Sequence, residues 1–288
     1  MHTSVRDNFP AFSTRLEGRV KHMYLDSLGN VTIAIGNKID PVADALDLAS
    51  LGAPLLRDSN NTKASDAEIT AEWTKVKGGS TATTLHLSEP SIDALVTKRL
   101  KQNETVLLTI FPGFDDWPAD AQLAILSMAW GLGPNALRPP KFQKLRAAIG
   151  ARKWLNAARE CNMTGSGLDK RNAVDRGLFR NAAVSEEPPA SDPAVLFLPI
   201  PGNRPKRQFG DGPNDPDVAV VQRMFNPARL DLLAPGTFTP GTFDSATLTA
   251  VKAFQSGEAA LPSSGPFPVT GVVAQLTWAC LGEHVPQA

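Results

Sequence analysis

Hydrophobic residues near the start of the chain recur at spacings of three and four, the period of a helix with one buried face. They are Phe9, Phe12, Leu16 and Val20. The next hydrophobic segments, residues 22–26 and 31–36, are short and are separated by a turn that contains Gly29. This pattern predicts a helix over residues 9–20, with Pro10 near its start, followed by two strands that form a β-hairpin.

Helical periodicity dominates the sequence that follows. It is found in residues 41–49, 65–79, 89–102, 118–133, 141–150, 151–162 and 170–183. Ser65 and Glu68 have the spacing of a capping box, which places a helix start at this point. The stretch 124–133 is apolar throughout but too short to cross a bilayer, so we expect a central helix that is buried on all sides.

Proline becomes frequent after the last of these helices, with eight prolines in residues 186–216. This composition favours an extended linker. Further helical patterns lie in residues 217–225, 244–255 and 270–281. The sequence therefore predicts an α+β protein: a mostly helical domain with a small β-hairpin sheet at 1–185, a linker at 186–216, and a small three-helix domain at 217–288.

Composition narrows the possible partners. The chain has 288 residues, 42% of them hydrophobic, which is enough for one large or two modest domains. Its 29 basic and 29 acidic side chains give zero net charge, which argues against nucleic acid or an anionic membrane as the main partner. We find no apolar segment typical of a secretory signal at the N-terminus and expect no membrane insertion.

The residues that most often bind metals do not cluster in the sequence. Cys161 and Cys280 lie far apart in different predicted domains, so we expect two buried free thiols. The histidines have no metal-ligand spacing, and we therefore predict neither a metal nor another cofactor. They are His2, His22, His86 and His284. We expect the protein to be a monomer.

Two carboxylates stand out in residues 16–36, LEGRVKHMYLDSLGNVTIAIG. Glu17 ends the first predicted helix beside apolar residues, and Asp26 lies at the polar turn of the hairpin. Taken alone, a Glu at a helix end and an Asp before a turn are most often ordinary solvated residues. Hydrolysis of a glycosidic bond, however, needs one protonated and one ionised carboxyl group, and these two environments favour those two forms. Thr32, on the returning strand, is placed to hold a water molecule.

The ordered pattern E-x8-D-x-x-G-x-x-T-I-x-I-G resembles the catalytic segment of phage-type lysozymes, which are glycoside hydrolases of family 24 and include the endolysins of tailed phages. The resemblance implies that Glu17 is the general acid, that Asp26 lies across the cleft and that Thr32 positions water. It makes Tyr24 either a cleft wall or a core residue, and Arg171 either a neighbour of the catalytic Glu or a surface residue.

The resemblance covers residues 9–183. The stretch DAQLAILSMAWGLGPNAL resembles the central helix of that family, and RNAVDRGLF resembles its closing helix. Residues 40–110 depart from the pattern because they are longer than in compact members. This insertion leaves the lining of the substrate cleft open.

The C-terminal region resembles a peptidoglycan-binding module. The matching residues are Gln222, Gly241, Phe243, Thr247, Ala250, Val251, Phe254, Gln255, Gly271, Thr277, Trp278 and Leu281. Most of these are core and turn residues, so they indicate the fold and leave the wall contacts within 217–288 unassigned.

Together the two resemblances predict a bacteriolytic muramidase that cleaves the β-1,4 bond between N-acetylmuramic acid and N-acetylglucosamine. Its partner would be bacterial peptidoglycan, reached in the periplasm without a secretory signal. A lytic transglycosylase and a non-catalytic wall-binding protein remain alternatives. The setting could be a phage endolysin released through a holin. It could also be an antibacterial effector of type VI secretion with an immunity protein, which the long insertion and the atypical linker slightly favour.

Overall fold

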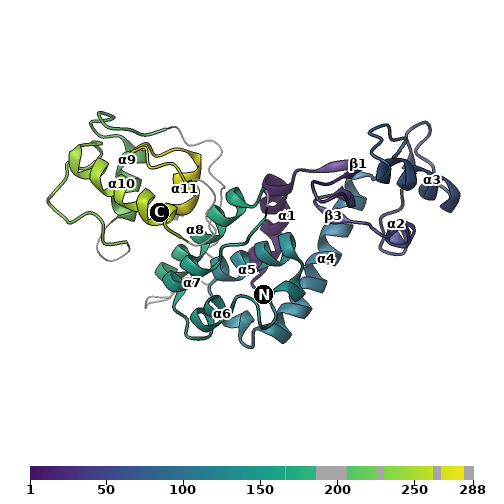
Figure 1. Ribbon diagram of the computed structural model, residues 1–288, viewed down its shortest axis with the longest axis horizontal. Coiled ribbons are helices and arrows are strands. Elements are labelled where there is room, and N and C mark those ends of the chain that lie inside the picture. The colour runs from purple at the N-terminus through teal and green to yellow at the C-terminus, as the bar shows by residue number, and fades with distance from the viewer. Residues whose placement is uncertain (166, 186–205, 226–229, 262–266, 282–288) are drawn as a thin grey trace. The chain divides into compact units, whose positions relative to one another are not determined.

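A computed structural model describes residues 1–165, 167–185, 206–225, 230–261 and 267–281. It is an α+β protein in which helices predominate and a small antiparallel sheet of five strands is formed, so the predicted class is confirmed (Figure 1). The chain divides into two compact units. One comprises Arg6–Thr109, and the other comprises Met1–Val5 together with Ile110–Ala288.

The unit Arg6–Thr109 contains most of α1 (Thr3–Glu17) and all strands of the sheet. Its further elements are β1 (Val20–Leu25), β2 (Val31–Ala34), β3 (Asn37–Lys38), α2 (Val42–Leu46), the 3₁₀ helix η1 (Asp47–Ala49), β4 (Leu56–Arg57), α3 (Asp66–Lys77), β5 (Leu85–His86) and α4 (Glu89–Ile110). The strand order is β3-β2-β1-β5-β4, and α3 packs on β1 and β2. The predicted hairpin is thus the centre of a larger sheet.

The first helix differs from its prediction. It begins at Thr3 rather than at residue 9, and Pro10 lies inside it rather than near its start. Proline lacks the N–H that would bond to the carbonyl one turn earlier, but the helix continues, and Thr14 Oγ1 donates to the Pro10 carbonyl at 2.8 Å. The helix ends at Glu17 because Gly18, with φ of 78°, adopts the left-handed conformation of a C-terminal cap.

The start of α3 confirms the predicted capping box. The Ser65 side chain accepts from the backbone N–H of Glu68, and the Glu68 carboxylate accepts from the Ser65 N–H at 2.7 Å. Arg57 Nε also donates to that carboxylate at 2.7 Å. The ion pair of Glu68 with Arg57 therefore ties the start of α3 to β4.

The second unit is helical. Its elements are η2 (Phe114–Asp116), α5 (Ala119–Leu132), η3 (Pro134–Leu137), α6 (Gln143–Gly150), α7 (Trp154–Glu160), α8 (Asp169–Ser185), α9 (Pro216–Met224), α10 (Ser245–Ala259) and α11 (Gln275–Leu281). Every residue of α5 up to Trp130 is buried, as predicted for a central helix, and α8 packs against α5, α7 and α11. Cys161 and Cys280 are both free and buried, which confirms that prediction.

Two glutamines of the C-terminal motif make the same set of hydrogen bonds. Gln222 Oε1 accepts from the N–H of Gly241 at 2.9 Å, and its Nε2 donates to Thr247 Oγ1 at 3.0 Å. In the same way, Gln255 Oε1 accepts from the N–H of Gly271 at 2.8 Å, and Gln255 Nε2 donates to Thr277 Oγ1 at 3.1 Å. Because these side chains fix turns inside the fold, they have a structural role, in agreement with the expectation that the motif indicates the fold.

The C-terminal helices pack on α8 through buried charged groups. Glu258 accepts from Arg176 Nε at 2.6 Å and also from Arg180, whose guanidinium donates in addition to the Cys280 carbonyl. The boundaries predicted at 1–185 and 217–288 remain predictions. Residues 186–205 of the predicted linker lie outside the described residues.

In the part of the chain that the structure describes, no helix has both the length and the apolar character needed to cross a membrane.

Candidate active site

Glu17 is the last residue of α1 and is half-exposed. Gly36, at the end of the hairpin, lies directly against it: a Cβ atom added at Gly36 would be 3.1 Å from Glu17 Oε2. The backbone φ of Gly36 is 65°, a value that residues with a side chain rarely adopt. The backbone conformation therefore favours glycine here, and a side chain at this position would displace the Glu17 carboxylate.

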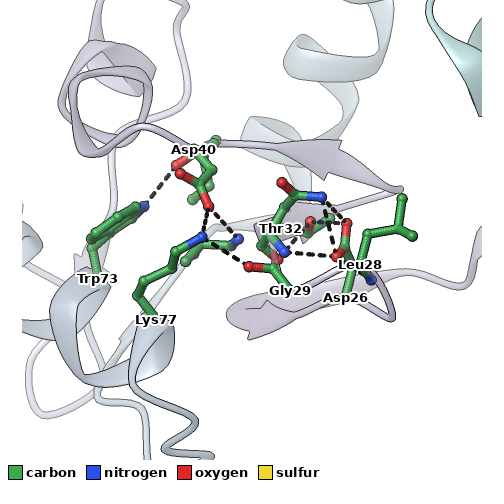
Figure 2. A network of polar contacts seen from close by, with 10 residues as sticks. Asp26, Leu28, Gly29, Thr32, Asp40, Trp73 and Lys77 are labelled. Atoms are coloured by element: carbon green, nitrogen blue, oxygen red, sulfur yellow. Dashed lines mark hydrogen bonds and ion pairs between the residues drawn. The ribbon is translucent and has the colours of Figure 1, made fainter.

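Asp26 follows β1 and closes the hairpin turn. Its Oδ1 accepts from the backbone N–H groups of Leu28 at 2.9 Å and Asn30 at 2.8 Å (Figure 2). Partial burial raises the pKa of Asp26, but the hydrogen bonds from Asn30, Leu28 and Thr32 outweigh it and hold the pKa below its ordinary value. The turn thus keeps this carboxyl ionised at neutral pH, the form that sequence reasoning requires of it.

Thr32 is buried on β2, and its hydroxyl is directed toward the same turn. Its Oγ1 lies 3.4 Å from Asp26 Oδ2 and 3.3 Å from the Asn30 carbonyl, both within hydrogen-bond reach. Since a hydroxyl has one proton and two acceptor lone pairs, Thr32 can donate a hydrogen bond to Asp26 and still accept one from a water molecule.

Tyr24 is a titratable group on which both carboxylates act electrostatically. It is the cross-strand partner of Thr32 in the β1–β2 ladder and is half-buried. Burial raises the pKa of Tyr24 above its ordinary value, and the negative charges of Glu17 and Asp26 raise it further. The phenol therefore lies within electrostatic range of both carboxylates.

Helix α3 supports the hairpin turn through two side chains. Lys77, the last residue of α3, donates through Nζ to the Gly29 carbonyl at 2.8 Å and to Asp40 Oδ2 at 2.5 Å (Figure 2). Trp73 Nε1, one turn earlier, donates to the Ile39 carbonyl at 2.7 Å. Sequence reasoning did not single out Lys77 or Asp40, because residues that meet only through a 37-residue separation leave no local signal.

Arg171 belongs to the other compact unit and is buried, with 4% of its surface exposed, so it is not a surface arginine. Its Nη1 donates to the carbonyl and Oγ of Ser127 at 3.0 and 2.9 Å, and its side chain packs on Gly131 of α5. A place in the substrate cleft beside Glu17 remains a prediction.

Asp175, one turn after Arg171 on α8, is a further titratable group that sequence reasoning missed. It is completely buried. Burial raises the pKa of Asp175 to about 7, although Arg171, Ser127 and Arg176 partly offset it. The sequence signal was the spacing of four from Arg171, which places both side chains on one face of the helix.

The described residues contain no group of three or more His, Cys, Asp or Glu side chains placed to hold a metal ion. Comparisons with models of known protein families, with curated proteins and with solved structures each found no match. The chemistry of the hairpin therefore has to be judged from its own geometry.

Proposed function

We propose that this protein is a peptidoglycan hydrolase of the muramidase type. In this reaction Glu17 donates a proton to the leaving oxygen of the β-1,4 bond, and Asp26 with Thr32 orients the attacking water. Tyr24 forms part of the cleft wall. The C-terminal helices, within 217–288, bind the wall polymer and raise the local concentration of substrate.

The observation that carries the proposal is the geometry of the hairpin turn, in which the Thr32 hydroxyl lies 3.4 Å from a carboxylate oxygen of Asp26. Glycoside hydrolysis needs an ionised carboxylate opposite an acid, and a water held by a second group favours a direct displacement. The common electrostatic influence of Glu17 and Asp26 on Tyr24 supports their placement around one site. Asp26 also caps its turn, so its role in folding and its proposed role in catalysis use the same hydrogen bonds.

Two alternatives make different predictions for the products. A lytic transglycosylase would use Glu17 alone, and its product would lack the elements of one water molecule. A non-catalytic wall-binding protein would release no product from purified sacculi. Mass spectrometry of the soluble products separates all three, and Asp26 with Thr32 favours the product of hydrolysis.

The direct test is Glu17→Gln, which keeps the shape of the side chain but cannot deliver a proton. Loss of a general acid reduces turnover by about 10²–10⁴-fold. The measurement is the release of reducing ends from purified sacculi. Glu160→Gln is the matched control, because Glu160 is likewise a half-exposed glutamate at the last position of a helix. A Glu17→Gln protein that keeps more than about half of the rate would exclude Glu17 as the acid.

A further inference from the structure

The unit Arg6–Thr109 contains a cavity of about 350 Å³ that the proposed reaction does not use. Its walls are formed by β3, α2, η1 and one face of α4. The residues that line it include Asn37, Leu48, Leu95, Lys98 and Asn103, whereas Glu17, Asp26 and Thr32 do not. The size falls within the range of small-ligand pockets.

Two buried amide side chains in these walls have unused hydrogen-bonding capacity. Asn37 is 9% exposed and Asn103 is 4% exposed. The Oδ1 acceptor of Asn37 and the Nδ2 donor of Asn103 have no hydrogen-bond partner among the described residues. A buried polar atom without a partner destabilises the fold, so such atoms are rare in folded proteins. A ligand amide offers one N–H and one C=O, which is the complement of this pair.

The rim of the cavity carries charges of both signs. Its exposed lining residues include Lys38 of β3 and Lys98 of α4. Asp44 of α2 and Asp47 of η1 are also exposed and line the cavity. Lys98 and Asp44 form no ion pair with any other residue in the described part of the chain. Leu48 and Leu95, which line the same cavity, are buried and apolar. A ligand that matches this lining has a free carboxylate, a free ammonium group and a short apolar part.

The geometry points to a binding site for a short peptide that carries a carboxylate, an ammonium group and a secondary amide, the chemistry of the stem peptide of peptidoglycan. This assignment rests on the proposed function, because it takes the peptide from the same polymer. Lys98 and Lys38 bind the carboxylate, Asp44 binds the ammonium group, and Asn37 with Asn103 binds the amide.

The cavity is connected to the proposed catalytic residues through the backbone. Arg99, another lining residue, donates through Nη1 to the Gly36 carbonyl at 2.6 Å. Gly36 precedes Asn37 and lies against Glu17. A peptide bound to Asn37 is therefore held one residue away from Gly36, which lies against the proposed acid Glu17. Binding of the peptide thereby orients the glycan to which the peptide is attached.

The test is calorimetric titration of the full-length protein with synthetic L-Ala-γ-D-Glu-meso-diaminopimelate. We expect saturable binding of the tripeptide, and binding at least about tenfold weaker for free diaminopimelate, which lacks the amide. Asn103→Leu and the exposed charge reversal Lys98→Glu should each weaken tripeptide binding by about tenfold or more. Lys101→Ala, at an exposed position of α4 that does not line the cavity, is the control and should leave it unchanged.

Equal affinity of the wild type and a folded Lys98→Glu protein would overturn the assignment, as would binding of N-acetylglucosamine in place of the tripeptide. Digestion of glycan strands stripped of peptide reports the proposed muramidase activity separately. Digestion without tripeptide binding refutes the peptide site alone. Absence of digestion refutes the muramidase, whatever the titration shows.

Discussion

The buried contact of the C-terminal helices with α8 predicts a large effect of one substitution, Glu258→Gln. The Glu258 side chain is 4% exposed and lies between Arg176 and Arg180, which are 2% and 7% exposed. Burial raises the pKa of Glu258, but Arg180 and Arg176 outweigh it and lower the pKa below the ordinary value. Glutamine preserves the volume and removes the charge, so Arg176 and Arg180 both lose the carboxylate with which they pair.

Breaking a buried ion pair by removing one partner costs about 3–5 kcal/mol. For a chain of this size each kcal/mol lowers the Tm by about 2–4 °C, so we expect a loss of roughly 10 °C. Glu89→Gln is the matched control. Its carboxylate is 50% exposed and pairs with Arg19 and Lys21, and exposed pairs contribute at most about 1 kcal/mol.

The assay is thermal unfolding of both variants and the wild type at pH 7 and at pH 3. Since the folded pKa of Glu258 is depressed, its stabilisation is fully present above the unfolded pKa of about 4.3 and is lost as the pH falls through the folded pKa. The difference between Glu258→Gln and the wild type should therefore shrink at pH 3. A Tm loss at pH 7 no larger than that of Glu89→Gln would refute the reasoning.

Three further predictions concern α8 and the hairpin. Asp175→Asn should raise the Tm at pH 8 and change it little at pH 4. Because the folded pKa of Asp175 is about 7, the cost of ionising the buried carboxyl grows from about pH 4 to pH 7. Equal Tm shifts at both pH values would contradict this prediction. Lys77→Met should lower kcat for sacculi about tenfold at unchanged KM, because it loosens the turn that holds Asp26, while Lys77→Arg should retain most of the rate. Proton NMR of the first products should show the α-anomer, since the Thr32 hydroxyl favours a held water over direct attack by Asp26; initial β-anomer would exclude this mechanism.

Local patterns predicted most helices and the hairpin correctly, because these elements are encoded by residues close together in the sequence. The capping box of Ser65 and Glu68 and the apolar central helix are examples. Long-range pairing was not predictable in this way. The two-residue strands β3, β4 and β5 are too short to show a period, and β5 joins the sheet only through partners such as His22, which pairs with His86.

The residues of the candidate site likewise fall into a group that one short segment could predict and a group that it could not. Glu17, Asp26 and Thr32 could be named from one short segment, and the structure places Asp26 and Thr32 in hydrogen-bond reach. The supporting contacts of Lys77 and Arg99 come from α3 and α4, and neither side chain belongs to a sequence motif. Nothing in the sequence could have shown that Asn37 and Asn103 share one cavity, because 66 residues separate them.

These contacts give α3 and α4 a physical role. A hairpin of two short strands is marginally stable on its own, and a turn that must present an ionised carboxylate loses precision if the turn opens. In this chain α3 holds the turn from one side through Lys77, and α4 holds Gly36 through Arg99. The residues between the hairpin and the central helix therefore include the side chains that fix the hairpin. Helices α3 and α4 act as a support for the proposed catalytic segment.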